Sequence, residues 1–168
     1  VQRELVRARM HLDFVVSLYR AQIEGGRLFL HEHPQAATSW EEDAIKEIMQ
    51  VPGVSRRVGD QCQYNAEVLF GHYRGEPVRK ATGFMSNGPL ILDELSKRCT
   101  GKLGRCSRPK GGQHVTCSGR VATDAARYPL DLCKAIVKGI SRELLARGII
   151  KAGEVGMHAV DDEGKELS

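Results

Sequence analysis

Short apolar runs bounded by turn residues alternate with amphipathic stretches along this chain, and that alternation restricts the folds it can adopt. Apolar residues recur at three- and four-residue steps over 2–24, which predicts a helix that ends at Gly25-Gly26. The same reasoning predicts further helices at 38–50, 90–98 and 129–147. Short apolar runs that end in turns predict strands at 27–32, 56–63 and 80–86.

This order of elements predicts an α/β fold, specifically part of a Rossmann-like sheet covered by helices in three layers. We assign residues 1–150 to that domain, with an irregular basic loop at 97–120, and residues 151–168 to a loosely ordered acidic tail. Three strands are few for an open α/β sheet. The N-terminus has neither an initiator Met nor a signal-peptide stretch, so we interpret the chain as a fragment of a longer polypeptide.

The composition argues against membrane proteins and disulfide-framework proteins. Hydrophobic residues make up 41% and charged residues 27% of the 168, the mix of a globular domain. No apolar run approaches the roughly 18 residues that a membrane helix needs. The five cysteines are an odd number with irregular spacing, which indicates a reducing compartment. We therefore expect an intracellular protein, nuclear or cytoplasmic, without a membrane partner.

The net charge of +4 is unevenly distributed along the chain. The segment between Leu95 and Thr123 contains no acidic residue but several cations, and glycine-bearing basic stretches suit phosphate contacts. The residues predicted to contact a nucleic-acid backbone are Lys97, Arg98, Lys102, Arg105, Arg108 and Lys110. The alternative is a solvated surface loop.

The same loop contains residues of the kinds that bind zinc. Cys99, Cys106, His114 and Cys117 follow the spacing C-x6-C-x7-H-x2-C. Thiolates and imidazoles are the usual ligands of structural zinc, which would stabilise a loop with little apolar content. The alternative is a set of free thiols in a flexible loop.

A Glu between two His residues ends the first predicted strand. Ligands in open α/β sheets bind outside the carboxyl ends of strands, which is where Glu32 is expected. Three interpretations remain open. His31 and His33 ligate a metal, or Glu32 is the working group in a pocket lined by the histidines, or these side chains only cap the strand by hydrogen bonds.

Several segments resemble those of one enzyme family when taken in order. The apolar strand that ends in Glu-x-Pro, followed by Ser39-Trp40, resembles the Glu-Asn-Val or Glu-Asn-Pro motif of DNA cytosine-5 methyltransferases. It also resembles divergent relatives of that family, which include methyltransferase-like domains embedded in phage and mobile-element proteins. Three further similar segments follow in the expected order, namely DQCQY at 60–64, KATGFMSN at 80–87 and YPLDLC at 128–133.

The resemblance implies a Rossmann-like enzyme that transfers a methyl group from S-adenosylmethionine to a flipped cytosine in DNA. In that mechanism Glu32 contacts the Watson–Crick edge of the base. The implied substrate-binding residues are His31, His33, Arg79 and Lys80. The family's Cys nucleophile and Gly-rich cofactor loop would lie before Val1. We therefore expect S-adenosylmethionine to bind the parent domain rather than this fragment, and leave open whether the chain is itself an enzyme.

Two other function classes stay open. The first is a non-catalytic nucleic-acid-binding module from a mobile-element polyprotein, with or without a stabilising zinc ion, in which the basic loop contacts the backbone. The second is a metal-dependent hydrolase or nuclease that uses His31, Glu32 and His33.

Overall fold

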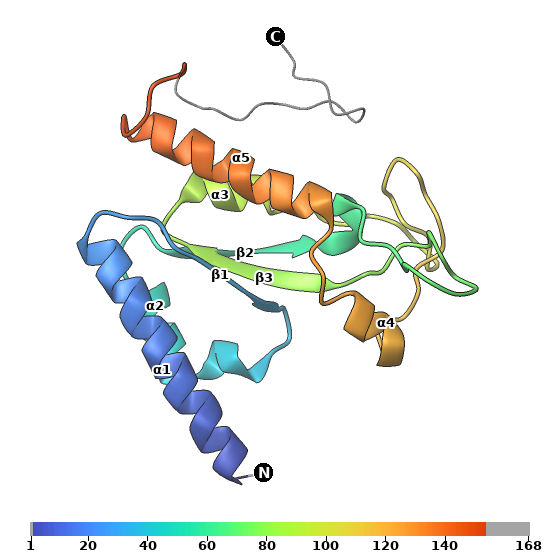
Figure 1. The fold of residues 1–168 in the computed structure, drawn as a ribbon, viewed down its shortest axis with the longest axis horizontal. Coiled ribbons are helices and arrows are strands. Elements are labelled where there is room, and N and C mark those ends of the chain that lie inside the picture. The colour runs from blue at the N-terminus through green and yellow to red at the C-terminus, as the bar shows by residue number, and fades with distance from the viewer. Residues whose placement is uncertain (1, 154–168) are drawn as a thin grey trace.

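The computed structural model describes residues 2–153, which form a three-stranded sheet between two layers of helices (Figure 1). Helices α1 and α2 lie on one face of the sheet, and α3 and α5 lie on the other. The elements in chain order are α1 (Gln2–Glu24), β1 (Leu30–Pro34), η1 (Thr38–Glu41), α2 (Asp43–Met49), β2 (Ser55–Asp60), η2 (Gln61–Tyr64), β3 (Ala81–Ser86), α3 (Pro89–Glu94), α4 (Gly119–Asp124) and α5 (Leu130–Ala146). The prediction of three strands in one helix-covered sheet is confirmed.

The strand order is β1-β3-β2, and β3 runs antiparallel to both neighbours. Strands β1 and β2 therefore run in the same direction and are joined through α2, with β3 inserted between them. The expected Rossmann-like sheet, which is mostly parallel, is not what these strands form. After η2 the chain turns back through residues 65–80, and β3 then enters the sheet between β1 and β2. The central strand therefore runs in the opposite direction to its two neighbours.

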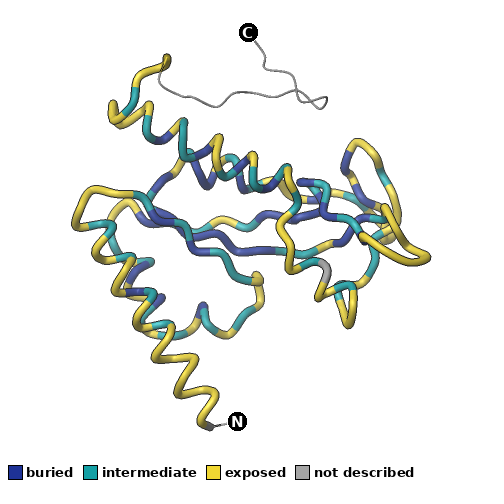
Figure 2. The backbone as a smooth tube through the Cα atoms, in the orientation of Figure 1, coloured by how far each residue is buried: buried dark blue, intermediate teal, exposed yellow. Residues whose placement is uncertain are grey.

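Strand β3 is buried on both faces and joins two cores (Figure 2). Met85 packs with Phe29, Trp40 and residues of α1 and α2, whereas Phe84 packs with Tyr64 and residues of α3 and α5. Successive side chains of a strand point to opposite faces, so this one strand supplies an apolar residue to each core.

Some boundaries differ from the sequence prediction. Residues 27–29 precede β1 because the side chain of Asn87 bonds the Phe29 N–H at 3.0 Å and the Arg27 carbonyl at 2.8 Å, in place of a ladder partner. The predicted helix 38–50 is divided into η1 and α2, because Glu42 is extended (φ −68, ψ 137). Helix α4 begins at Gly119, within the last residues of the predicted loop 97–120.

The predicted acidic tail lies outside the described residues from 154 onward. Within 2–153, no helix is long and apolar enough to cross a membrane.

Candidate metal centre

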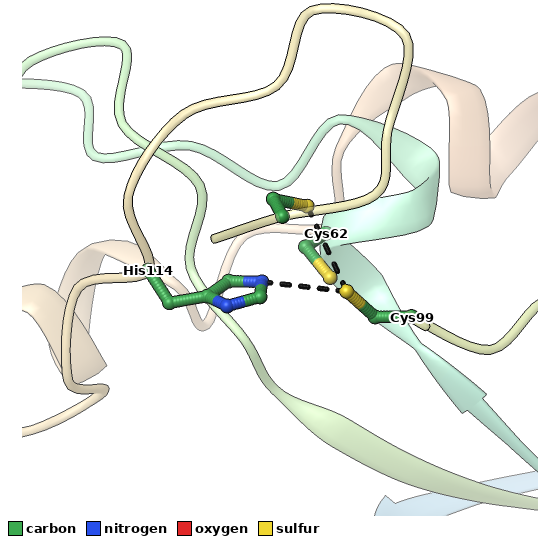
Figure 3. Close-up of side chains that lie close together, drawn as sticks. Cys62, Cys99 and His114 are labelled. Atoms are coloured by element: carbon green, nitrogen blue, oxygen red, sulfur yellow. Dashed lines mark hydrogen bonds between the residues drawn. The ribbon is translucent and has the colours of Figure 1, made fainter. Parts of the chain in front are cut away.

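Three cysteines and one histidine converge beyond the end of β2 (Figure 3). Cys62 lies in η2, directly after β2, and the other three residues lie in the loop that follows α3. One ligand atom from each of Cys62, Cys99, Cys106 and His114 lies within 4.8 Å of all the others. The three cysteines are buried and reduced, so the cluster can hold a metal ion.

The separations fit a tetrahedral metal site. The Sγ atoms of Cys99 and Cys106 are 3.9 Å apart, and Cys99 Sγ is 3.6 Å from His114 Nε2. In a tetrahedron with metal–sulfur bonds of about 2.3 Å, two sulfur ligands are roughly 3.8 Å apart. These two separations match a tetrahedral ion, and all four ligand atoms lie within 4.8 Å of one another.

The end of β2 positions the first two ligands. Asp60 is fully buried, and its Oδ2 accepts a hydrogen bond from the Cys99 N–H at 2.8 Å and forms an ion pair with Arg98 Nε at 3.0 Å. The Asp60 N–H donates to the Lys97 carbonyl at 2.9 Å. These bonds fix the start of the loop beside η2, which brings Cys99 to Cys62.

Hydrogen-bond donors surround the sulfur atoms. Gln63 Nε2 donates to Cys62 Sγ at 3.7 Å and to Cys106 Sγ at 3.6 Å, and the Ser107 hydroxyl donates to Cys99 Sγ at 3.6 Å. Donors of this kind orient metal ligands and stabilise the negative charge of a thiolate. The cluster therefore has a supporting shell as well as four ligand atoms.

The environments of two of the four ligands, Cys99 and His114, favour metal binding at neutral pH. Burial opposes ionisation of Cys99, but hydrogen bonds from Ser107 and Gly101 outweigh it and lower the pKa of this thiol to about 7. Burial lowers the pKa of His114, which keeps the imidazole neutral and able to donate its lone pair. Burial raises the pKa of Cys62 to about 12, so a bound cation is needed to hold that sulfur as a thiolate.

Three of the four predicted ligands converge, and one does not. Cys117 is half-buried and outside the cluster, and Cys62 takes its place. After His114 the chain turns away, because the Val115 N–H donates to the Pro77 carbonyl at 3.0 Å. Cys62 was not among the predicted ligands, and its position near the end of the predicted strand 56–63 was the one signal that could have identified it.

The predicted nucleic-acid contacts have different environments. Arg108 is only 5% exposed and donates to Glu67 at 2.7 Å and to the Gly75 carbonyl at 2.8 Å, so it is a structural residue. Arg98 pairs with Asp60, and Lys97 lies over the Tyr64 ring at 5.3 Å. The predicted cations that are exposed are Lys97, Arg98, Lys102, Arg105 and Lys110.

The residues around Glu32 lie on opposite faces of the sheet. Glu32 is opposite Phe84, on the sheet face that α3 and α5 cover, and its Oε2 accepts a hydrogen bond at 2.7 Å from Tyr128, which lies just before α5. Its Oε1 is buried, with no partner among the described residues. His31 is opposite Met85 and faces α1, where its Nδ1 bonds the Tyr19 hydroxyl at 2.8 Å.

His33 stacks on His31 with ring centroids 5.9 Å apart, so both histidines point away from Glu32. The three residues therefore do not form the single metal site that a hydrolase would need. Lys80 donates to the Ala125 carbonyl at 3.2 Å, and Arg79 is exposed beside His114, whose pKa it helps to lower. Of the four residues predicted to bind substrate, His31 and His33 therefore stack on each other, whereas Lys80 contacts Ala125 and Arg79 lies beside His114.

Comparison with family models, curated proteins and solved structures finds no match for this chain.

Proposed function

We propose that this chain is a zinc-stabilised nucleic-acid-binding module. The observation that carries the proposal is the convergence of Cys62, Cys99, Cys106 and His114, whose ligand atoms lie within 4.8 Å of one another. Three thiolates and one imidazole are the ligands of structural zinc, and four protein ligands leave no open position for a catalytic water. The role of the ion is then to hold a loop rather than to catalyse a reaction.

The composition of the loop supports a stabilising role for zinc. The buried cluster under the loop consists of Cys62, Cys99 and Cys106 and contains no larger apolar side chain. A segment without an apolar core needs another source of folding free energy, and zinc binding supplies it in small domains. The same loop carries Lys102, Arg105 and Lys110 at its surface, where they can contact phosphates.

Metal analysis tests the zinc assignment. We expect one zinc ion per chain in the wild-type protein and in Cys117→Ser, because Cys117 lies outside the cluster. Cys62→Ser should lose the ion. Equal zinc content in all three proteins, or no zinc in any, would contradict the proposal.

Salt titration tests the nucleic-acid contacts. Each phosphate contact contributes about 0.7 to the log–log salt slope on single strands and about 0.9 on duplexes. Replacing Lys102, Arg105 and Lys110 with Gln should flatten that slope. The control changes Arg7 and Lys134, which are also exposed but lie on α1 and α5. Identical slopes in both variants would mean that the loop cations are only solvated.

A second candidate rests on Glu32. Its Oε1 is buried and free to accept a hydrogen bond, as expected of a residue that reads a base edge in a cytosine-5 methyltransferase-like domain. In that proposal the three strands belong to a larger Rossmann-like sheet of the parent domain. Glu32→Gln should abolish methyl transfer from S-adenosylmethionine to DNA cytosine by the full-length polypeptide, and 1–168 alone should show no S-adenosylmethionine binding by calorimetry. Methyl transfer that survives the substitution rules out this role.

A further inference from the structure

A hollow of about 760 Å³ borders the metal centre. Its two walls are formed by residues 72–76 and by residues 113–121, and His114 belongs to both the hollow and the metal cluster. The volume lies within the range of about 300–1,000 Å³ that ligand sites in proteins occupy. None of the residues identified from the sequence, apart from His114, lines this hollow.

One wall presents aromatic rings to solvent. Tyr73 is 57% exposed, and Phe70, on the same turn, is 59% exposed. The His72 and Tyr73 rings meet edge to face with centroids 5.1 Å apart. Exposed aromatic rings in a polar loop have no role in the core, but they are suitable surfaces for stacking of bases.

Hydrogen bonds hold the loop that carries these rings, residues 68–76, in place. The Val68 N–H donates to the Glu76 carbonyl and the Gly75 N–H donates to the Val68 carbonyl, both at 2.9 Å. Arg108, which lies in the loop that contains Cys99, Cys106 and His114, donates to the Gly75 carbonyl at 2.8 Å. The loop that carries the His72 and Tyr73 rings is therefore fixed relative to the candidate metal centre.

One cation lines the hollow, and two others are backbone neighbours of lining residues. Arg74 lines it, Arg79 follows Val78, whose backbone forms a β-bridge with Val115, and the Arg105 backbone forms a β-bridge with Gln113. Glu76 is the one acid among the lining residues, and its Oε2 accepts the Gln113 N–H at 2.6 Å. Aromatic rings with flanking cations and little negative charge match the chemistry of a polynucleotide.

We infer that this hollow binds a single-stranded polynucleotide, with a base stacked on Tyr73 and phosphates contacting Arg74, Arg79 and Arg105. This inference rests on the proposed nucleic-acid function and names its substrate class. Stacking on a protein ring requires an unstacked base, which a single strand offers and a duplex does not. DNA and RNA share this chemistry.

The test measures fluorescence anisotropy with oligothymidylate, oligouridylate and a duplex of the same length. The wild-type protein should prefer the single strands. Tyr73→Ala should bind them roughly 5- to 150-fold more weakly, the effect of one lost base–aromatic stack, and Tyr73→Phe should keep most of the affinity. The two single strands distinguish DNA from RNA, and tighter binding of either supports the inference.

A second readout does not depend on affinity. Trp40 is the one tryptophan of the chain and is 2% exposed, so a tryptophan introduced by Tyr73→Trp reports on the hollow. Its fluorescence should be quenched when a single strand stacks on it. Absence of quenching under saturating oligonucleotide overturns the inference.

The outcomes separate the two proposals. Binding that depends on Lys102, Arg105 and Lys110 but ignores Tyr73→Ala and duplex formation overturns the inference and leaves the proposed function standing. Absence of binding to all three probes overturns both.

Discussion

Arg108 illustrates how position decides the role of a charged residue. In the sequence it is one of several cations in a basic loop, but its side chain is buried and bonded to Glu67, Gly75 and Gly111. Those bonds join the loop that contains Cys99, Cys106 and His114 to residues 67–75. Breaking a buried ion pair by removing one partner is costly, because the other charge remains desolvated.

We expect Arg108→Gln to lower the free energy of unfolding by about 3 kcal/mol. The matched change Arg105→Gln removes an exposed cation from the same loop and should alter stability by less than about 0.5 kcal/mol. Urea denaturation of the three proteins measures both effects. Equal stability of the two variants would show that the ion pair of Arg108 contributes nothing.

His31 should make the fold sensitive to acid. Burial, assisted by the nearby charges of His33 and Arg56, lowers its pKa from 6.5 to about 4. The folded state therefore favours neutral His31, and this contribution is complete above pH 6.5 and is lost as the pH falls toward 4. The full loss is on the order of 2–3 kcal/mol.

Unfolding experiments at neutral pH and near pH 4.5 on His31→Gln test this expectation. The variant should lose less stability between the two pH values than the wild-type protein. His11→Gln, on the exposed side of α1, is the control and should behave as the wild type does. A parallel loss in His31→Gln would exclude His31 as the source.

At the scale of elements, local patterns predicted what depends on local interactions. Helix α1 has the predicted bounds, because three- and four-residue periodicity extends over its whole length. The break between η1 and α2 was not predictable from helical periodicity, because it accompanies a contact outside the helix, the hydrogen bond from Trp40 Nε1 to the Pro34 carbonyl. Cys62 was missed as a ligand because only the tertiary fold brings it close to Cys99, Cys106 and His114.

Gly139 sets the distance between α5 and α3. A Cβ at this position would lie 2.7 Å from the Ile91 Cα, closer than such atoms approach. Gly139→Ala gains about 1 kcal/mol of helix propensity but incurs an overpacking cost of about 1–3 kcal/mol. We expect a lower melting temperature, whereas Lys134→Ala on the exposed side of α5 should not lower it. A stabilised Gly139→Ala would mean that α5 shifts freely on α3.

Removal of the metal should affect one segment selectively. With a chelator, hydrogen exchange should accelerate at 97–118, whose buried apolar cluster consists of Cys99 and Cys106 packed against Cys62. Strand β3 should retain its protection, because Phe84 and Met85 are fully buried in the two apolar cores. Unchanged exchange in the loop would show that it folds without an ion.

At the scale of the whole molecule, the layers were predictable but the strand directions were not. Apolar runs indicate that strands exist and that helices cover them, whereas direction depends on how 65–80 returns the chain to the sheet. The result is a sheet whose middle strand belongs to both cores. The two faces should therefore unfold together.

A substitution on one face tests this cooperativity with a probe on the other. Phe84→Ala should destabilise the protein by about 3–5 kcal/mol. Trp40 lies in the opposite core, so its fluorescence should report the same shift if unfolding is two-state. If the midpoint of the unfolding transition seen by Trp40 fluorescence stayed at the wild-type denaturant concentration, the two cores would unfold independently.

His114 belongs to the metal cluster through its Nε2 and to the neighbouring hollow through its position in the wall. An ion that fixes this ring fixes part of the hollow, so the two binding events share one side chain. Thermodynamic linkage then works in both directions. If zinc tightens oligonucleotide binding by some factor, the oligonucleotide must tighten zinc binding by that same factor, and the occupied protein should release its ion more reluctantly to a competing chelator.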